Sequence, residues 1–371
     1  MHPLPLASKR RDRLLSAVLT AAERVVDRAR ATPRAPVAPR RVVVLKSCCL
    51  GDALLATPLI GALRRAYPQA RIVAGIGRWA RPALVGNRDL DGLLDLEGVG
   101  TGRFDPGAYV RALRRLRGGR FDVALTLDRT PLLTLLPLLA GIPVRAGIDS
   151  AGRGLPLNVR VPWTAVEHEA ELFLRVGAAL GVPVDEARLR FDPTPDDEAR
   201  ADVLWREAGL DGKRVLALLP GGGRNPGMTM ETKRWPPARY AALADALFER
   251  HGLIPVLTGD GEDRPVTAEA RRLMRAPAID ITGATTLGAL GAFYRRCALF
   301  VGNDSGPTHL AAAAGAPVVA VFGPTDPAVY APYSARAIAL RGPHGISTAE
   351  VDVDEAVAAA ERLLSRGVGE V

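Results

Sequence analysis

The sequence of 371 residues predicts an α/β protein made of two consecutive halves. Short apolar runs typical of strands alternate with longer runs typical of helices along most of the chain. The first strand of each half, at 41–46 and 214–220, leads directly into a turn that contains glycine. An acidic, Pro-containing stretch at 191–213 interrupts the alternation near the middle. Because the length exceeds that of a typical single core, we expect two domains, 41–205 and 206–371.

The first half is predicted to hold a parallel sheet. Its strands are expected at 41–46, 70–76, 121–128 and 144–149. The unbroken apolar character of "RVVVLK" is typical of a strand buried on both faces. A helix is expected from the turn "SCCLGD" to Pro68, and Pro58 within it predicts a kink or a late helix start.

The second half repeats this pattern. Its strands are expected at 214–220, 254–259, 278–283, 298–303 and 317–323. A helix is predicted over 236–251, with Gly252 as its stop. Ligands of open α/β sheets bind at the carboxyl ends of the strands, so two such sheets facing each other predict one cleft between the domains.

Most of the positive net charge of the chain lies in its first 41 residues. Residues 1–41 carry ten Lys/Arg and three Asp/Glu, which is +7 of the formal net charge of +9. Aromatic residues make up only 5%, too few for a surface built to stack bases. Since the rest of the chain is nearly neutral, we expect no nucleic-acid partner.

Residues 1–40 are predicted to form a basic amphipathic helix followed by a Pro-rich linker at 31–40. One interpretation is a helix that lies on the anionic inner face of the membrane. The other is a helix docked on the domain, or a frayed tail. No apolar run is long enough to span a bilayer, so the expected location is cytoplasmic, peripheral at the inner membrane face if the first interpretation holds.

The three cysteines are Cys48, Cys49 and Cys297. This number predicts no disulfide framework and suits a reducing compartment. We expect Cys48 and Cys49 to pack as small side chains, although a helix start can activate a thiol.

The stretch "VGNDSGPTHLAAAAGAPVVAVFGPTDP" at 301–327 places a polar turn between two apolar runs. Ser305 or Gly306 can cap the following helix, with Pro307 in its first turn. The helix start would then offer N–H groups to an anion, with His309 nearby. The alternative is a capped helix without a ligand.

A second turn, "LPGGGRNPGMTMETKRWP" at 219–236, follows the first strand of the second half. Three glycines leave the backbone free to wrap phosphate oxygens, and Lys233 and Arg234 supply cations. It lacks the Gly-Lys-Ser/Thr ending of a Walker A loop. The alternative is a flexible loop before a helix.

Two further turns carry carboxylates. In "KSCCLGDALLATP" at 46–58, Gly51 permits a close approach, and Asp52 is either a helix cap or a base that accepts a proton. In "TGDGEDRP" at 258–265, Glu262 or Asp263 could hold a ribose diol, or the loop is simply solvated.

These turns together resemble glycosyltransferase family 9, the family of the ADP-heptose:lipopolysaccharide heptosyltransferases. Four pieces carry the resemblance, in order and spread over roughly 41–335: "RVVVLKSCCLGDALLATPLIGALRRAYPQARI", "LPGGG…KRWPPARYAALADAL", "VLTGDGED" and "VGNDSGPTHLAAAAGAPVVAVFGPTDP".

The resemblance implies a GT-B fold, two Rossmann-like domains facing across a cleft. It implies an N-terminal domain that binds the acceptor, a C-terminal domain that binds the nucleotide sugar, and inverting transfer without a metal ion or other cofactor. Its residue roles are an acceptor-side Gly51, a base at Asp52 and a donor-binding, catalytic Lys233. The remaining donor site would comprise Gly221, Gly222, Gly223, Glu262, Asp304, Ser305, Gly306 and His309.

The expected activity is therefore transfer of a sugar, with heptose from ADP-heptose as the leading choice, to a cell-envelope glycan or glycolipid such as lipopolysaccharide. The alternatives are a nucleotide-sugar epimerase of the same fold and a non-catalytic module that binds nucleotide sugars. The sequence departs from the family at the Cys48–Cys49 pair, where small hydroxyl residues are common, and in the longer loop 224–232.

Overall fold

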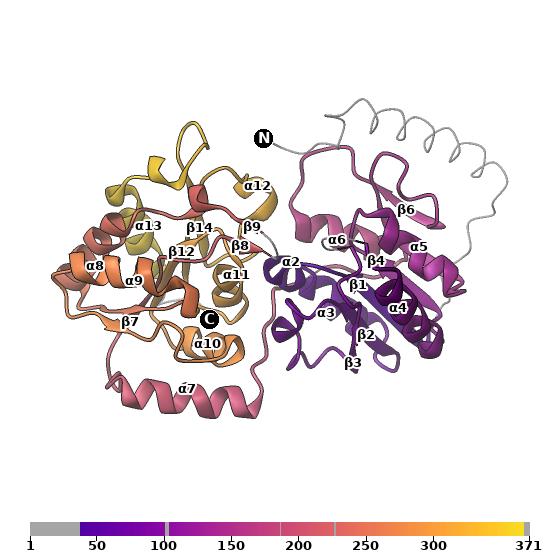
Figure 1. Cartoon of the computed structure of the whole chain (residues 1–371), viewed down its shortest axis with the longest axis horizontal. Coiled ribbons are helices and arrows are strands. Elements are labelled where there is room, and N and C mark those ends of the chain that lie inside the picture. The colour runs from indigo at the N-terminus through magenta and orange to yellow at the C-terminus, as the bar shows by residue number, and fades with distance from the viewer. Residues whose placement is uncertain (1–37, 101–103, 186, 226–227, 367–371) are drawn as a thin grey trace. The chain divides into compact units, whose positions relative to one another are not determined.

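The computed structural model describes residues 38–100, 104–185, 187–225 and 228–366, which form two compact units that divide after Arg188 (Figure 1). The helix and the Pro-rich linker predicted for residues 1–40 lie outside the described residues, except for residues 38–40 of the linker. Within the described ranges, no helix has the length and apolar character needed to cross a membrane.

The N-terminal unit is an α/β layer structure with one sheet. Its strands are β1 (Arg41–Lys46), β2 (Arg71–Ile76), β3 (Gly92–Asp95), β4 (Val123–Thr126), β5 (Val144–Asp149) and β6 (Val159–Pro162). Its helices are α2 (Leu50–Leu55), α3 (Thr57–Ala66), α4 (Pro106–Gly119), α5 (Pro131–Leu139) and α6 (Glu169–Ala178), with a short 3₁₀ turn, η1 (Arg81–Ala83).

The C-terminal unit repeats the same design. Its strands are β7 (Val215–Leu219), β10 (Ile254–Leu257), β11 (Ile279–Asp280), β12 (Leu299–Asn303), β13 (Val318–Phe322) and β14 (Ala337–Arg341), with a two-stranded ribbon of β8 (Arg224–Asn225) and β9 (Met228–Thr229). Its helices are α7 (Pro195–Glu207), α8 (Pro237–His251), α9 (Arg264–Leu273), α10 (Leu287–Tyr294), α11 (Gly306–Ala313), α12 (Pro327–Tyr330) and α13 (Val353–Arg366). Its 3₁₀ turns are η2 (Glu231–Lys233), η3 (Gly261–Asp263) and η4 (Thr348–Glu350).

Both six-stranded sheets are parallel and have the same strand order. The N-terminal sheet runs β3-β2-β1-β4-β5-β6 and the C-terminal sheet runs β11-β10-β7-β12-β13-β14. This is the doubly wound order of a dinucleotide-binding fold, in which the direction of winding reverses beside the first strand. The reversal lies between β1 and β4 in one unit and between β7 and β12 in the other. A crevice for ligands is therefore expected at the carboxyl ends of these two strand pairs.

Helices cover both faces of each sheet, which explains the unbroken apolar strands. In β1, Val43 and Leu45 pack with residues of α4 and α5, while Val42 and Val44 are buried on the opposite face, where α3 and α6 pack together. In the C-terminal unit, α8, α9 and α13 share one buried cluster with β7, β12 and β13. The central strands of each sheet are thus fixed in the interior.

The predicted helix after β1 is interrupted, as Pro58 indicated. Ala56 separates α2 from α3, and Pro58 lies in the first turn of α3, where its missing N–H costs nothing. The predicted helix end at Gly252 is also confirmed: this residue has φ 63° and its N–H donates to the carbonyl of Phe248 at 2.9 Å.

The division between the units lies earlier than the expected 205/206 boundary, because α7 packs on α10. The Trp205 and Phe293 rings lie 5.1 Å apart, and Glu198 forms an ion pair with Arg295. Phe191 already donates its N–H to Ala313 of the C-terminal unit at 3.1 Å. The sequence showed α7 only as a polar stretch, because just one of its residues is buried. Strands β3, β6 and β14 and the ribbon β8–β9 were not predicted.

Candidate active site

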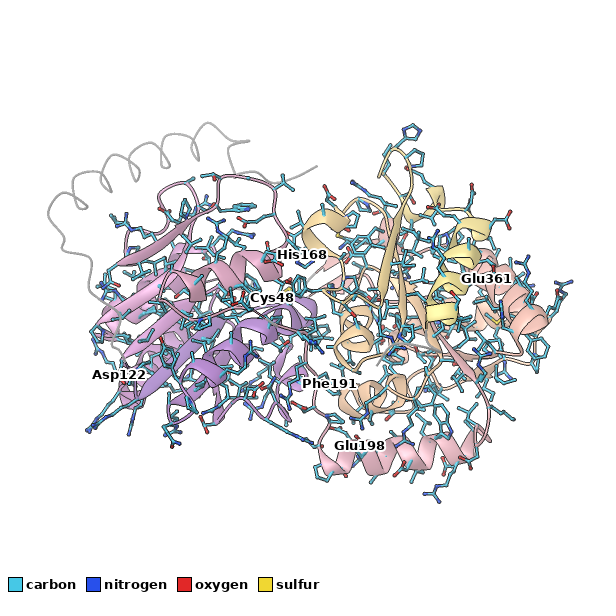
Figure 2. All side chains as sticks on the ribbon, turned by 180° about the vertical axis from the view of Figure 1, so that it is seen from behind. Cys48, Asp122, His168, Phe191, Glu198 and Glu361 are labelled. Atoms are coloured by element: carbon cyan, nitrogen blue, oxygen red, sulfur yellow. A yellow bond between two sulfur atoms is a disulfide. The ribbon has the colours of Figure 1, made fainter. Side chains whose placement is uncertain are left out.

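The N-terminal site lies at the reversal between β1 and β4. Lys46 is the last residue of β1, and Asp128 follows β4 by two residues. In Figure 2, the labels of Cys48 and His168 lie at one end of the unit and that of Asp122 at the opposite end. Asp122 accepts the N–H of Arg41 at 2.8 Å, which marks the amino edge of the sheet. The polar residues that follow the strands therefore share the carboxyl edge, as the winding rule requires.

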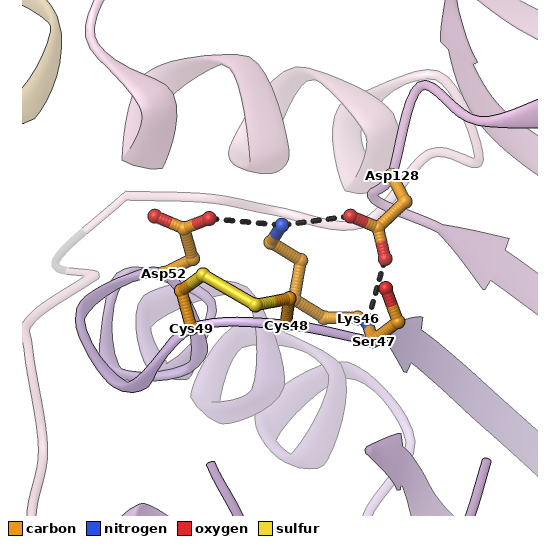
Figure 3. The surroundings of a disulfide bond; sticks show 6 residues. All are labelled: Lys46, Ser47, Cys48, Cys49, Asp52 and Asp128. Carbon is orange, nitrogen blue, oxygen red and sulfur yellow. Dashed lines mark hydrogen bonds and ion pairs between the residues drawn. A yellow bond between two sulfur atoms is a disulfide. The ribbon is translucent and has the colours of Figure 1, made fainter. Parts of the chain in front are cut away.

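Lys46 joins two carboxylates in this site. Its Nζ lies 2.8 Å from Oδ1 of Asp128 and 3.0 Å from Oδ2 of Asp52 (Figure 3). The other Asp128 oxygen accepts the N–H of Ser47 at 2.6 Å. Burial lowers the pKa of Lys46, but the charges of Asp128 and Asp52 outweigh burial and hold that pKa above its ordinary value. The ammonium is therefore a permanent cation that fixes both carboxylates.

Asp52 is the more accessible of the two carboxylates. It lies in the first turn of α2 and its side chain is 29% exposed, against 13% for Asp128. The expectation that it caps the helix is wrong, because the N-cap of α2 is Cys49 and no side chain caps it. Asp52 instead turns its carboxylate toward Lys46. Gly51 lies beside it in the same helix.

A second ion pair, Arg129–Glu169, lies close enough to influence this site. The guanidinium of Arg129 stacks 3.9 Å from the ring centre of Trp163 and forms an ion pair with Glu169, the first residue of α6. Burial raises the pKa of Glu169, the charge of Arg129 lowers it less, and the charge of Asp52 raises it further. The influence of Asp52 on Glu169 and Lys46 shows that these groups form one electrostatic cluster.

Cys48 and Cys49 form a disulfide in the turn between β1 and α2, which corrects the expectation that they are separate packing residues (Figure 3). Cys49 has φ 75°, a left-handed conformation rare for residues other than glycine. The conformation of this turn brings the sulfur atoms of two consecutive residues together. Cys297 is free and buried.

The C-terminal site lies at the reversal between β7 and β12. Lys233, in η2, places its Nζ 2.6 Å from Oδ2 of Asp304, the residue after β12. Thr325 also donates its hydroxyl to Asp304. The Asp304 side chain is only 7% exposed and that of Lys233 13%. A shielded ion pair at the carboxyl edge of a doubly wound sheet is a suitable place for a phosphate group.

The glycine loop 221–223 is held against this pair from two sides. Asn303 donates its amide to the carbonyls of Pro220 and Gly221, at 3.0 and 2.8 Å. Gly222 has φ 79°, and a Cβ there would lie 3.0 Å from the side chain of Ser305. Gly223 has φ 70°. The loop thus needs glycine for its backbone conformation, and at Gly222 also for the close approach of Ser305.

Asp263 anchors the same loop from the opposite side. It is buried, and its Oδ1 accepts the N–H of Gly222 at 3.1 Å and Nη2 of Arg224 at 3.0 Å. A Cβ at Gly221 would clash with it. The neighbouring Glu262 is exposed. Of the two carboxylates left open by the sequence, Asp263 therefore supports the loop, and the ribose role of Glu262 stays a prediction.

The start of α11 differs from the capped helix expected from the sequence. Ser305 is the N-cap residue, but its hydroxyl donates to the carbonyl of Asn303 at 3.2 Å and makes no cap hydrogen bond. Gly306 opens the helix and Pro307 occupies its first turn, as predicted. His309 is buried at 5% exposure, so a role in binding an anion stays a prediction.

Several residues of these sites were not singled out from the sequence, among them Lys46, Asp128 and Glu169. Lys46 and Asp128 could have been found, because each is the last residue of a strand range that the sequence predicts, and such residues meet at the carboxyl edge. Glu169 gave no such signal, since it is the first residue of a helix far along the chain and reaches Arg129 only through the fold.

Comparisons with known proteins agree on one family. The family model described as glycosyltransferase family 9 (heptosyltransferase) matches residues 109–356. Lipooligosaccharide heptosyltransferase 2 of Haemophilus influenzae is 27% identical over 312 residues, covering 81% of this chain and 88% of the relative. Lipopolysaccharide heptosyltransferase 2 of Escherichia coli K12 is 28% identical over 317 residues, with the same two coverages.

Solved structures show the same fold. The family 9 glycosyltransferase of Veillonella parvula has a TM-score of 0.75 and 25% identity, covering 89% of this chain and 98% of that one. The E. coli ADP-heptose lps heptosyltransferase II has a TM-score of 0.72 and 24% identity, covering 89% and 100%. The predicted GT-B class is thus confirmed, and the facing of the two domains across a cleft stays a prediction. The chain belongs to glycosyltransferase family 9 and is a glycosyltransferase.

Proposed function

We propose that this enzyme transfers heptose from ADP-heptose to a lipopolysaccharide or related cell-envelope acceptor, with inversion and without a metal ion. The printed names of its relatives, lipooligosaccharide and lipopolysaccharide heptosyltransferases, support heptose and this class of acceptor. The observation that carries the donor half of the proposal is the shielded Lys233–Asp304 pair beside the glycine loop.

The donor diphosphate is proposed to bind at the C-terminal site. When the sugar–oxygen bond breaks, the leaving diphosphate gains negative charge. The ammonium of Lys233 can meet this charge, because Asp304 holds it at the carboxyl edge of the sheet. The backbone of Gly222 and Gly223 lets phosphate oxygens approach closely. In this proposal Lys233 stabilises the charge that a metal ion would otherwise stabilise.

The acceptor hydroxyl is proposed to lose its proton to Asp52. Inverting transfer needs one base, placed on the side of the sugar opposite the leaving group. Asp52 is accessible, and Lys46 holds one of its oxygens, so that the other can face the hydroxyl. Lys46 and Asp128 are positioning residues in this scheme, because they act on the acceptor only through Asp52.

The basic N-terminal segment is proposed to bring the enzyme to the cytoplasmic face of the inner membrane. Residues 1–41 carry most of the net charge of the chain, and lipopolysaccharide precursors are amphiphilic. Basic side chains in this segment would gain free energy from anionic lipid headgroups.

The test of the donor site is a thermal-shift screen of the full chain against ADP, GDP, UDP and TDP and against the corresponding sugars. A ligand that binds only the folded protein raises the apparent melting temperature. ADP and ADP-heptose are expected to stabilise the wild type but not Lys233→Met. The matched control is Lys213→Met, which changes an exposed lysine of the same unit and is expected to keep the full shift.

Stabilisation by a different nucleotide would contradict ADP-heptose as the donor, but it would not contradict the proposed donor site in the C-terminal unit. An equal shift in wild type and Lys233→Met would remove Lys233 from the site. Binding of ADP-heptose without any transfer to a delipidated lipopolysaccharide core would contradict the proposed acceptor.

A further inference from the structure

The disulfide between Cys48 and Cys49 lies next to the proposed base and has no part in the reaction described above. Both side chains are partly exposed, so a small thiol can reach them. Figure 3 shows the bond beside Asp52 and Lys46. The bond closes a ring of side-chain and backbone atoms around a single peptide unit. Opening it therefore changes the freedom of the backbone at this turn.

The backbone of Cys49 is directly coupled to α2. Its carbonyl accepts the N–H of Ala53 at 3.0 Å, the hydrogen bond that begins the helix. Its φ of 75° is disfavoured for a residue with a Cβ, and the ring restricts its rotation. Without the ring, Cys49 can return to a negative φ, as is usual for the residue before a helix. That rotation would turn the Cys49 carbonyl and the first turn of α2 with it.

Asp52 lies within this first turn, immediately before Ala53. Its carboxylate is 3.0 Å from Nζ of Lys46, which belongs to the rigid strand β1. Rotation at Cys49 would therefore move Asp52 relative to a fixed partner. A general base must lie within hydrogen-bond reach of the proton it removes, and a displacement of about 1 Å can lower a rate by about 10²-fold.

We propose that Cys48 and Cys49 form a reversible thiol–disulfide site for small dithiols and their cyclic disulfides, and that the bond holds Asp52 in its working position. The effect on turnover rests on the proposed role of Asp52, whereas the effect on α2 does not. Reduction opens the ring, loosens the first turn of α2 and lowers turnover. Oxidation restores both.

The small dithiol supplies the electrons and protons that reduction of the Cys48–Cys49 bond requires. One thiolate of the reductant attacks a sulfur of the pair and forms a mixed disulfide, and the other cysteine leaves as a thiolate. The second thiol of the reductant then displaces the remaining cysteine and closes its own disulfide. Two electrons and two protons pass from the reductant to Cys48 and Cys49. The oxidised dithiol reverses the same steps.

The first experiment measures hydrogen exchange of the full chain before and after treatment with dithiothreitol, with the thiol state checked by alkylation and mass spectrometry. Peptides covering Leu50–Leu55 are expected to exchange about tenfold faster in the dithiol form. The double variant Cys48→Ser/Cys49→Ser is expected to exchange like the reduced wild type in both conditions. Cys297→Ala keeps the pair and is expected to respond like the wild type. Identical exchange in the two wild-type forms would overturn the proposal.

The second experiment measures release of ADP from ADP-heptose with a delipidated lipopolysaccharide core as acceptor. Reduction is expected to lower kcat about tenfold and to leave KM for ADP-heptose unchanged, because the donor residues belong to the other unit. The same or a higher kcat after reduction would overturn the proposed link to turnover.

Asp52→Asn separates this proposal from the proposed function. If Asp52 carries the effect, reduction no longer changes the residual turnover of this variant, although exchange of α2 still responds. If Asp52→Asn keeps full turnover, the proposed base is wrong and the exchange result stands by itself. A redox effect on turnover that persists in Asp52→Asn would contradict transmission through Asp52.

Discussion

At the scale of single residues, the carboxylate of Asp52 is held by one cation. Lys46 holds it, and Asp128 holds Lys46 from the opposite side. Asp128 is in turn fixed by the backbone N–H of Ser47. Each group in this row thus orients the next, and the outermost, Asp52, is the more exposed of the two carboxylates. Such an arrangement suits a base that must act in one position.

Asp52→Asn keeps the size of the side chain and removes its ability to accept a proton. We expect kcat to fall by about 10²- to 10⁴-fold, because a general base is lost. The affinity for ADP-heptose, measured by titration calorimetry, should stay unchanged. Asp185→Asn changes an exposed aspartate of the same unit and should leave both quantities unaltered. If donor affinity fell as much as turnover, Asp52 would have a structural role instead.

Asp263 and Glu262 are neighbours with different tasks. Asp263 is buried and accepts the N–H of Gly222 and the guanidinium of Arg224, so Asp263→Ala would leave the glycine loop without this anchor. We expect the free energy of unfolding of the C-terminal unit, measured by urea denaturation, to fall by about 1–3 kcal/mol.

Glu262→Ala provides the matched comparison. Because Glu262 is exposed, its loss should change the free energy of unfolding by less than about 0.5 kcal/mol. If it contacts the ribose, the affinity for ADP should fall nonetheless. Unchanged affinity for ADP would assign Glu262 to the solvated loop.

At the scale of elements, the start of α6 carries a buried carboxylate into the N-terminal site. Glu169 is fixed there by its ion pair with Arg129, whose guanidinium stacks on Trp163 beyond β6. Three separate elements of the chain thus meet beside Asp52. Packing between distant elements brings this cluster together, and no local sequence motif does so. Its charged groups therefore influence one another's pKa.

Glu169 predicts a pH dependence of stability. Burial, its largest influence, raises the pKa of Glu169 in the folded state, so the folded protein holds this proton at a pH where the unfolded chain has lost it. Its contribution to stability is therefore complete below the unfolded pKa of about 4.3 and is lost as pH rises through the raised folded pKa.

The test compares wild type with Glu169→Gln by urea denaturation between about pH 4 and pH 8. The stability of the wild type relative to this variant should fall as pH rises. Glu171→Gln changes an exposed residue of the same helix and should show no such trend. A difference that stays constant over this range would show that Glu169 titrates alike in the folded and unfolded states.

At the scale of the whole molecule, two units of the same strand order present different charged groups. Both place a charged site at the reversal of a doubly wound sheet, because that is where strand ends leave a crevice. One site presents an accessible carboxylate, and the other a shielded ammonium. The first suits removal of a proton and the second suits stabilisation of a leaving diphosphate.

The basic segment of the chain is expected to add membrane attachment. Replacing Arg11, Arg13, Arg24 and Arg28 by Gln should reduce co-sedimentation with vesicles that contain anionic phosphatidylglycerol, because the electrostatic attraction is lost. Lys at the same four positions keeps the charge and should keep the binding. Turnover with a delipidated acceptor should stay unchanged in both. Equal sedimentation of the Gln variant and the wild type would contradict a membrane role for this segment.

The sequence by itself determined the two α/β halves, the first strand of each and the turns that carry the sites. It could do so because buried parallel strands are continuous apolar runs, and because glycine, proline and capping residues mark their ends. Asp52 and Lys233 were singled out in such turns, whereas Asp304 was singled out through the resemblance to the family. Such turns can be recognised from the sequence because the residues that form them are close together along the chain.

Only the tertiary structure decided which partners these residues have. Lys46 meets Asp128 across the distance of 82 residues, and Lys233 meets Asp304 across 71. The assignment of α7 to the C-terminal unit, the role of Asp263 under the glycine loop and the bond between Cys48 and Cys49 were equally invisible in the pattern. Each depends on backbone conformation and on packing between distant elements, which periodicity and composition do not encode.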